Sequence, residues 1–334
     1  MSARITDTLN LLGSLSPRRA FNLLKLYLSY YYSRYSGKVR HAGNPFTISI
    51  EPTTSCNLRC PECPSGLRKF TRNTGALSLE LFSDVIDQLS PDLFYLILYF
   101  QGEPYLNPLF FQMVEEAKKK RIYTATSTNA HFLTNTLAKK TVECGLDRII
   151  ISLDGLDQAT YEKYRVGGSV EKVIEGTRNL IKWKKELRSM TPYIILQFIV
   201  FSTNEHQVSE LKKWAKDLGV DKLELKSAQV YNYEEGNQLI PSKGEYARYK
   251  KQNGKFIIDN PLNNHCLRMW RGCVVTWDGL VVPCCFDKDA DHRMGDLKNE
   301  SFKDIWRGEK YDDFRRKLFT ARKEIDICKN CTEK

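Results

Sequence analysis

The sequence lacks any apolar stretch near the roughly 18 residues that a membrane-spanning helix needs. Its longest candidate, residues 93–100, is predicted to be a buried strand. The N-terminus also lacks the uninterrupted apolar core of a secretory signal, because Asn10, Gly13 and Ser14 break residues 9–15. These absences exclude a transmembrane protein and predict a cytoplasmic location.

Acidic residues are scarce at the start of the chain, where residues 1–45 contain seven Lys or Arg and only Asp7. The 334 residues as a whole include 51 basic and 40 acidic side chains, so the formal charge is +11 and more than half of it is local. With 42% hydrophobic and 27% charged residues, the composition predicts a folded core in roughly two domains.

One helix is predicted between Ser16 and Gly37, because the segment has a serine cap, a proline in its first turn and a glycine stop. Apolar and aromatic side chains recur along it at the spacing of one helical face: Phe21, Leu24, Leu28, Tyr31 and Tyr35. Either the helix packs on the protein with a solvated basic face, or it contacts a membrane surface or a protein partner.

Short β-rich runs alternate with amphipathic helices over residues 46–227. The six predicted strands are Phe46–Ile50, Tyr95–Tyr99, Tyr123–Thr128, Arg148–Ser152, Tyr193–Val200 and Lys222–Lys226. Repeated βα units favour a parallel sheet with right-handed crossovers. Six units predict an α/β fold with a partial (β/α)6 barrel and an active site at the C-terminal strand ends.

The pattern divides the chain into four predicted parts. These are a basic N-terminal helical segment (1–45), the partial barrel (46–227), a linker (228–264) and a small cysteine-rich domain (265–334). The last part has too little regular hydrophobic periodicity to fold without covalent or metal cross-links. Its six cysteines could supply such cross-links as metal ligands.

The ten cysteines form two groups, three at 56–63 and six after residue 264, with Cys144 alone between them. Cytoplasmic thiols stay reduced, so metal or redox chemistry is favoured over disulfides. Cys144 precedes Gly145 at a predicted helix end, and we expect an ordinary buried thiol there.

Cys56, Cys60 and Cys63 follow the first predicted strand with the spacing C-x3-C-x2-C. Three thiolates can bind three irons of a cubane that normally takes four cysteines, which leaves one iron open to an external ligand. Zinc is the alternative, but it would need a fourth ligand, and the next His or Cys is His131. Together with the later motifs, this pattern resembles the radical S-adenosylmethionine (SAM) superfamily over about residues 46–334.

The resemblance implies an enzyme whose [4Fe-4S] cluster binds SAM and, once reduced, cleaves it to a 5′-deoxyadenosyl radical that abstracts a substrate hydrogen. It also implies an electron donor such as flavodoxin or ferredoxin. Gly102 and Glu103 are similar to the family's G-G-E motif, which receives the SAM ammonium. Gln101 departs from the first glycine of that motif, and Glu62 departs from the aromatic or apolar residue usual before the third cysteine.

Further SAM-binding residues are implied at later strand ends. Ser127 and Asn129 end the third strand, Ser152 would meet the ribose, and Arg165 would bind the methionine carboxylate as a planar, donor-rich side chain. The alternatives are ordinary strand-end hydrogen bonds for Ser127, Asn129 and Ser152, and a surface salt bridge for Arg165.

The tail resembles the SPASM extension, which binds auxiliary iron–sulfur clusters, through Cys266, Gly279 and Cys284. Because the printed chain stops three residues after Cys331, we expect one auxiliary [4Fe-4S] cluster. Its expected ligands are Cys266, Cys284, Cys328 and Cys331. A zinc ribbon is the alternative for this tail.

Cys273 and Cys285 are left over by this assignment. Each is a substituting ligand, an inert buried thiol or a hydrogen-atom donor. If the segment is extended, Cys285 points away from Cys284 and could act catalytically by quenching a substrate radical.

The sequence therefore predicts an oxidoreductase or maturase that oxidises, crosslinks or epimerises a sugar-like small molecule or a peptide or protein substrate. The alternative from another class is a zinc-stabilised nucleic-acid-binding protein that uses the basic helix and the cysteine tail.

Overall fold

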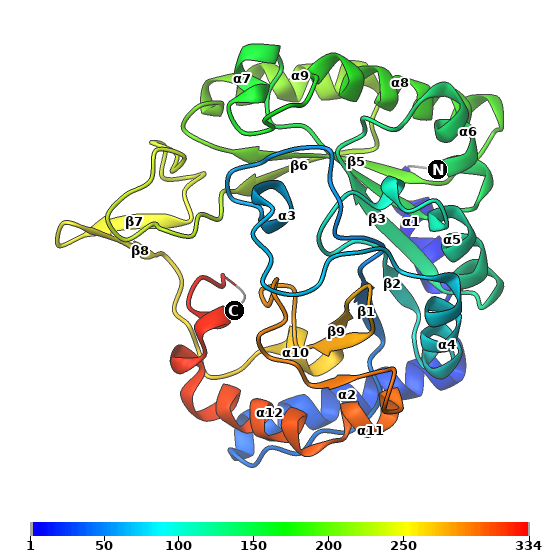
Figure 1. Ribbon diagram of the computed structural model, residues 1–334, viewed down its shortest axis with the longest axis vertical. Helices are drawn as coiled ribbons and strands as arrows, with labels where there is room; N and C mark the ends of the chain where they lie inside the picture. The colour runs from blue at the N-terminus through cyan, green and yellow to red at the C-terminus, as the bar shows by residue number, and fades with distance from the viewer. Residues whose placement is uncertain (1–2, 333–334) are drawn as a thin grey trace. The chain divides into compact units, whose positions relative to one another are not determined.

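The computed structural model describes residues 3–332 (Figure 1). Two compact units are formed, each from separate segments of the chain. The first unit contains Met1–Asp7, Cys56–Lys69 and Thr126–Asn260, and the second contains Thr8–Ser55, Phe70–Ala125 and Pro261–Lys334.

The second unit contains a mixed sheet. Its strands are β1 (Thr47–Ile50), β2 (Tyr95–Ile97), β9 (Gly272–Val275), β10 (Leu280–Val282) and β11 (Gly295–Asp296), and β3 (Tyr123–Thr128) begins in it. The strand order is β11-β10-β9-β1-β2-β3. β1 pairs in parallel with both β2 and β9, whereas β10 is antiparallel to β9 and β11. Glycine is required where β9 begins, because a Cβ on Gly272 would lie 2.2 Å from the Thr47 carbonyl oxygen.

Helices of the second unit flank this sheet (Figure 1). They are α2 (Pro17–Ser36), α4 (Leu79–Leu89), η1 (Pro104–Leu106), α5 (Phe110–Lys119), α10 (Leu267–Arg271), α11 (Phe302–Trp306), α12 (Glu309–Ala321), η3 (Arg322–Glu324) and η4 (Asp326–Cys328), and α1 (Ala3–Gly13) leads into the unit. Alternate strand residues such as Ile48, Ile50 and Leu96 are fully buried, as expected for a core face of a sheet.

The first unit carries the later βα repeats. Strands β4 (Arg148–Ser152), β5 (Tyr193–Val200) and β6 (Lys222–Ser227) are parallel and adjacent in that order. The remaining elements are α3 (Pro64–Leu67), α6 (Asn135–Glu143), α7 (Gln158–Glu162), α8 (Val170–Glu186), η2 (Glu205–Gln207), α9 (Val208–Leu218) and the antiparallel hairpin β7 (Tyr249–Gln252) and β8 (Lys255–Ile258).

The predicted α/β class with parallel strands is confirmed. All six predicted strands are present within two residues of their expected ends. β11 and β6 are edge strands, so the strands form an open, partial barrel. Two features were not predicted: β9 joins the sheet beside β1, and the segment expected to be a linker contains the β7–β8 hairpin.

Helix α2 begins and ends where the sequence predicts. Ser16 accepts a hydrogen bond from the Arg19 backbone N–H, and Gly37 stops the helix in the left-handed region at φ 72°. The helix packs on its own unit, which is the first of the two alternatives, but it does not pack through the predicted stripe. The stripe is exposed, and Leu26 and Tyr30 pack inward instead, because both faces of this helix carry apolar residues.

Other expectations concern single features. Cys144 is a buried thiol at the end of α6, where it donates to the Thr141 carbonyl at 3.3 Å. Gly219 ends α9 in the left-handed region with φ 87°. Among residues 3–332, no helix is long and apolar enough to cross a membrane.

Candidate active site

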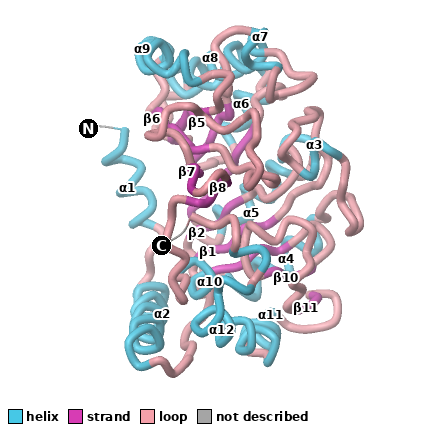
Figure 2. Tube along the Cα trace, turned by 90° about the vertical axis from the view of Figure 1, so that its left-hand side faces the viewer, coloured by secondary structure: helices cyan, strands magenta, loops and turns pink. Residues whose placement is uncertain are grey.

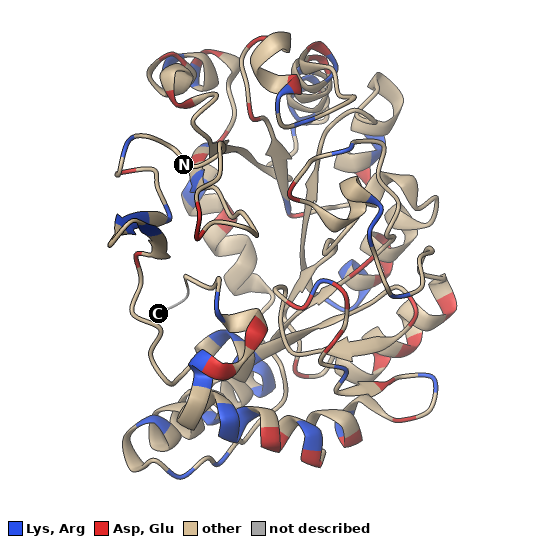
Figure 3. Ribbon diagram, turned by 60° about the vertical axis from the view of Figure 1, so that its left-hand side comes forward, with Lys and Arg blue, Asp and Glu red and all other residues tan. Residues whose placement is uncertain are grey.

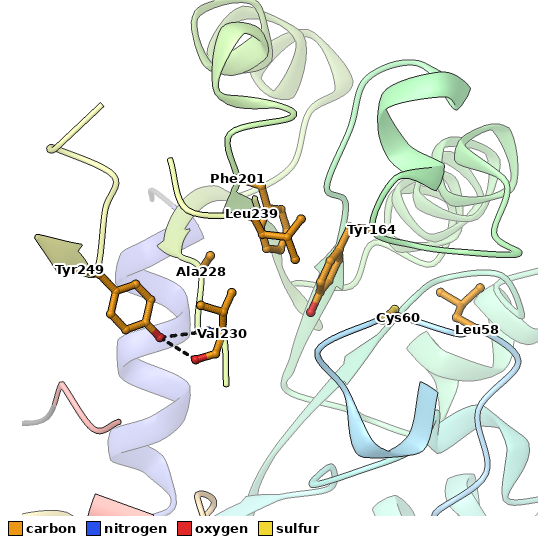
Figure 4. Packing of buried hydrophobic residues seen from close by; sticks show 8 residues of the cluster. All are labelled: Leu58, Cys60, Tyr164, Phe201, Ala228, Val230, Leu239 and Tyr249. Atoms are coloured by element: carbon orange, nitrogen blue, oxygen red, sulfur yellow. Dashed lines mark hydrogen bonds between the residues drawn. The ribbon is translucent and has the colours of Figure 1, made fainter. Parts of the chain in front are cut away.

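The C-x3-C-x2-C loop of the first unit is held in place by its own backbone and by a hydrophobic cluster. The Arg59 N–H donates to the Val166 carbonyl at 3.0 Å, and the Cys63 N–H donates to the Cys60 carbonyl at 3.3 Å. Cys60 lies in the cluster that also contains Leu58, Tyr164 and Phe201 (Figure 4). This packing orders the loop without any bound group.

Three N–H donors approach the sulfurs of this loop. The Leu58 N–H lies 3.5 Å and the Asn129 Nδ2 4.0 Å from the Cys56 Sγ, and the Arg165 Nη1 lies 3.9 Å from the Cys60 Sγ. Such donors stabilise negative charge on cysteine sulfur, as second-shell hydrogen bonds do around iron–sulfur clusters. Burial raises the pKa of the Cys60 thiol and Arg165 opposes that rise. The donor set therefore fits a cluster held by three thiolates.

Arg165 is fixed by a buried carboxylate. Its Nε donates to the Asp154 Oδ2 at 2.6 Å, and the Ile199 N–H donates to the other oxygen of Asp154 at 2.7 Å. Burial raises the pKa of Asp154, while Arg165 and the Ile199 N–H oppose that shift. The Asn204 amide donates to the Asp154 carbonyl at 3.0 Å. The sequence analysis assigns no role to Asp154, although its position two residues after β4 was a signal for one.

Asn129 and His131 connect the third strand to its surroundings. The Asn129 amide donates to the Asn57 side chain at 2.8 Å, and the His131 Nε2 accepts the Ser169 N–H at 2.8 Å, at the start of α8. Burial lowers the pKa of His131. Its ring therefore serves the local structure, which removes the nearest histidine from the zinc alternative. Ser152 is buried at the end of β4, and Ser127 lies half-buried in β3.

The G-E pair belongs to the second unit and lies against the segment that leads into Cys56. Gly102 has φ 72°, and a Cβ there would lie 2.2 Å from the Thr53 carbonyl oxygen. The Glu103 N–H donates to the carbonyl of Ser55, the residue before Cys56, at 2.8 Å. The buried Glu103 carboxylate also accepts the Tyr105 N–H at 3.3 Å. Gln101, the departure from the family motif, is buried as well.

Glu62, the second departure, binds the segment that follows the barrel. Its carboxylate accepts the Tyr231 N–H at 2.9 Å and the Asn237 amide at 3.2 Å. A charged residue at this position therefore holds Tyr231 and Asn237 of the first unit against the cysteine loop.

Four cysteines of the tail form one group in the second unit. Electrostatic interactions connect Cys266 with Cys331, Cys284 with Cys266 and Cys328, and Cys328 with Cys331, and Cys284 also interacts with the adjacent Cys285. These are the four residues that the sequence analysis expects as auxiliary-cluster ligands.

Arg322 is a buried cation in this group that the sequence analysis missed. Its Nη2 lies 3.6 Å from the Cys331 Sγ, and its Nη1 donates to the carbonyls of Asn263 and His265 at 3.1 and 2.7 Å. Burial raises the pKa of the Cys328 thiol to about 11, and Arg322 opposes that rise. Its position in a run of charged residues at the end of α12 carried no sequence signal for this role.

The two remaining tail cysteines differ. Burial raises the pKa of Cys273 to about 12, opposed by Tyr311 and Arg315, and none of the four grouped cysteines contributes to that shift. Cys285 accepts a hydrogen bond from the Arg268 Nη1 at 3.0 Å. The premise that an extended segment separates Cys284 and Cys285 is wrong, because β10 ends at Val282 and the Asp287 N–H closes a turn onto the Cys284 carbonyl at 3.1 Å.

Both adjacent cysteines line one cavity of about 200 Å³ in the second unit. Its other walls come from β1, the end of β2, β9 and α10, and include Ser49, Tyr99, Arg268, Arg271 and Gly272. This cavity is therefore lined by one expected cluster ligand, Cys284, and by two further cysteines, Cys285 and Cys273.

Within residues 3–332, no three His, Cys, Asp or Glu side chains come close enough to bind one metal ion. A tetrahedral zinc site draws its ligands around a single ion. A [4Fe-4S] cubane spreads its cysteines, because each thiolate binds a different iron.

Comparisons with known proteins agree with this geometry. Residues 50–218 match the family model of the radical SAM superfamily, and residues 266–332 match SPASM, an iron–sulfur cluster-binding domain. The tungsten-containing aldehyde ferredoxin oxidoreductase cofactor-modifying protein of Pyrococcus furiosus is 27% identical over 320 residues, covering 85% of this chain and 86% of that protein.

Two further similar proteins have other names and other lengths of match. PqqA peptide cyclase of Bradyrhizobium diazoefficiens is 23% identical over 266 residues, covering 72% of this chain and 67% of that protein. The structure of BtrN in complex with AdoMet and 2-DOIA has a TM-score of 0.55 at 20% identity and covers 88% of this chain and 95% of that one.

Proposed function

Because the chain belongs to the radical SAM superfamily and carries a SPASM domain, we propose that it removes a hydrogen atom from a substrate group seated in the second unit's cavity, with net oxidation. When bound, the reduced SAM-binding [4Fe-4S] cluster supplies the electron that splits SAM into methionine and a 5′-deoxyadenosyl radical, and the auxiliary [4Fe-4S] cluster takes the electron that the substrate radical gives up as it loses a proton.

The SAM-binding cluster is assigned to Cys56, Cys60 and Cys63. The N–H donors of Leu58, Asn129 and Arg165 lie against the sulfurs of Cys56 and Cys60 and would offset their charge. Glu103, Ser152 and Arg165 are assigned to SAM, together with Gly102, Ser127 and Asn129. With its Nε on Asp154, the Arg165 guanidinium is oriented before SAM arrives.

The observation that supports oxidation is that Cys284 lines the cavity. A substrate group in this hollow contacts a residue assigned as an auxiliary-cluster ligand, so an electron has a short path from substrate to cluster. Cys266, Cys328 and Cys331 complete the assigned ligand set, and Arg322 compensates its charge.

The size of the cavity bears on the substrate. About 200 Å³ is below the roughly 300–1,000 Å³ of sites that enclose a whole drug-sized ligand. It suits one ring or side chain, which is compatible with a sugar-like alcohol or with a residue of a peptide. The guanidinium groups of Arg268 and Arg271 in its wall supply donors for oxygen atoms of that group. A flavodoxin or ferredoxin in the cytoplasm is the proposed electron source.

A redox-neutral epimerisation is the second candidate, and the position of Cys285 favours it. Its Sγ borders the same cavity, where an S–H could return a hydrogen atom to a substrate radical. The Arg268 Nη1 donates a hydrogen bond to this sulfur at 3.0 Å, so Cys285 is already engaged by a neighbouring side chain of the cavity wall. We therefore place oxidation first.

The test uses anaerobically reconstituted full-length protein reduced with dithionite. Small-molecule and peptide fractions of a bacterial extract are added with SAM, and 5′-deoxyadenosine is quantified for each. One fraction should raise 5′-deoxyadenosine well above the level without extract, and the product should have lost two hydrogens. The Cys285→Ser variant should keep this oxidation. Loss of product in Cys285→Ser, with unchanged SAM cleavage, would favour epimerisation, and absence of 5′-deoxyadenosine despite full iron content would overturn the whole assignment.

A further inference from the structure

Helix α2 turns an apolar face away from its own unit. Phe21, Leu24, Leu28, Tyr31 and Tyr35, which we call the α2 stripe, lie on one helical face and are 43–79% exposed. Figure 2 shows α2 at the outer edge of the second unit, beside α10 and α12. Exposed apolar side chains gathered on one face are a common mark of an interaction surface.

The fold does not need this stripe. The opposite face of α2 already packs through Leu26 and Tyr30 into a cluster with Phe46 and Trp270. The Tyr30 hydroxyl lies 3.0 Å from the His265 Nδ1, and the Trp270 Nε1 donates to the Ser29 Oγ at 2.8 Å. These contacts anchor the helix, so the outward aromatic residues contribute little to folding.

The charge along the chain segment that contains the stripe has one sign. Residues 8–50 contain six Lys or Arg and no Asp or Glu. Figure 3 marks Lys and Arg in blue and Asp and Glu in red along the ribbon. Arg18 is bound to Asp92 at 2.9 Å, and the buried Arg19 donates to four backbone carbonyls. The remaining four are exposed: Lys25, Arg34, Lys38 and Arg40.

Two of these cations lie directly against the stripe. The Lys25 Nζ is 4.4 Å from the Phe21 ring centroid, and the Arg34 guanidinium carbon is 5.8 Å from the Tyr35 ring centroid. Apolar surface is thus bordered by positive charge that can contact a negatively charged partner while the rings are buried.

We propose that the α2 stripe binds the surface of an anionic phospholipid bilayer, with the helix lying in the interface plane. Leucine and phenylalanine would enter the acyl boundary, tyrosines suit the headgroup level, and the flanking cations would meet lipid phosphates. Helix α2 itself contains no Asp or Glu that anionic lipids would repel. The charge pattern favours this partner over an electrically mixed protein surface. This inference is independent of the proposed reaction.

Vesicle flotation of the full-length protein tests the proposal. Vesicles of phosphatidylcholine alone are compared with vesicles that also contain phosphatidylglycerol. The protein should float with the mixed vesicles, and binding should weaken at high salt because exposed charges are screened. The double variant Leu24→Ser/Leu28→Ser should lose at least about tenfold in vesicle affinity, because two apolar side chains no longer enter the bilayer.

Matched variants separate this effect from general changes in surface character. Leu187→Ser/Met190→Ser removes two exposed apolar side chains elsewhere and should bind like the wild type. Lys25→Glu/Arg34→Glu should abolish the preference for phosphatidylglycerol, whereas the equally exposed pair Lys212→Glu/Lys213→Glu should not. Thermal melts should show all four variants folded, since each residue is exposed.

Three outcomes would overturn the proposal. In the first, the protein remains at the bottom of the gradient and floats with neither kind of vesicle. In the second, the stripe variant and the control variant bind vesicles equally. In the third, light scattering shows a dimer that only Leu24→Ser/Leu28→Ser converts to a monomer, without vesicle binding, and the stripe then joins two copies of this chain.

Discussion

Arg165 and Asp154 form a buried ion pair with a Nε to Oδ2 distance of 2.6 Å, and the same guanidinium reaches to 3.9 Å from the Cys60 Sγ. Asp154 lies two residues after the end of β4, and Cys60 belongs to the loop assigned to the SAM-binding cluster. The pair therefore links a strand end of the first unit to its cysteine loop. The hydrogen bond to Asp154 fixes the orientation of the Arg165 guanidinium.

Replacing Asp154 by Asn should destabilise the protein by about 3–5 kcal/mol, because it leaves the buried Arg165 charge without its partner. Chemical denaturation of the reduced apoprotein measures this loss. Asp157→Asn is the matched control in the same loop, and it should cost less than about 1 kcal/mol because asparagine caps the first turn of α7 about as well as aspartate does. Equal effects of the two variants would contradict the assigned importance of the ion pair.

Changing Cys56, Cys60 and Cys63 together to Ala should abolish 5′-deoxyadenosine formation while leaving about four irons per chain, the content of one cubane. Iron analysis and chromatography of the reaction measure both quantities. The reciprocal variant, with Cys266, Cys328 and Cys331 changed to Ala, should retain the other cluster. SAM cleavage by the first variant would show that the SAM-binding cluster lies elsewhere.

Glu103→Gln and Arg165→Ala should each weaken SAM binding by about 1.5–3 kcal/mol, the range of one charge-assisted hydrogen bond. Calorimetry on the reconstituted protein gives the dissociation constants. Glu116→Gln, on the half-buried side of α5, serves as a control for loss of a carboxylate and should bind SAM normally. Unchanged affinity in both test variants would remove these residues from the SAM site.

Arg322→Gln should reduce the iron retained by the C-terminal cysteines, because a buried cation 3.6 Å from the Cys331 Sγ would no longer offset thiolate charge. The iron content of the variant that lacks Cys56, Cys60 and Cys63 reports on this cluster alone. Arg316→Gln, an exposed arginine of α12, should leave that content unchanged. If both arginine variants retain iron equally, Arg322 has no role at the cluster.

His41 should make stability depend on pH below neutrality. Its Nε2–H donates to the Trp270 carbonyl at 3.0 Å, and burial lowers its pKa to about 3, with nearby Arg315 adding to the shift. The unfolded chain binds a proton near pH 6.5 and the folded chain does not until about pH 3, so this contribution is complete above pH 6.5 and is lost as the pH falls.

The expected loss between pH 7 and pH 5 is about 2 kcal/mol, from about 1.4 kcal/mol per pH unit below the unfolded pKa. Denaturation of the wild type and of His41→Gln at both pH values measures the contribution of His41 to the change in the free energy of unfolding. The difference between the two slopes should equal the expected loss, whereas the exposed His206→Gln should follow the wild type. Parallel slopes for all three proteins would refute a buried neutral His41.

Much of the secondary structure and the chemistry could be read from short segments. The six strands follow from local apolar patterns, and the ends of α2 follow from Ser16 and Gly37, because these signals act over a few residues. The spacing of Cys56, Cys60 and Cys63 indicated a cluster with an open iron, and the family match agrees with that prediction. The boundaries of the four predicted parts and the roles of single SAM-binding residues stay predictions.

The tertiary structure decided burial, strand pairing and ion pairing, because these depend on residues that are distant in the chain. Helix α2 is apolar on two faces, so periodicity alone could not show that Leu26 and Tyr30 pack inward while Phe21 and Leu28 stay exposed. β9 pairs with β1 across most of the chain, and a turn after Val282 brings Cys284 and Cys285 to one cavity. In the same way, a charged residue in the sequence does not reveal its counter-ion, because burial and pairing arise only when separate segments pack together.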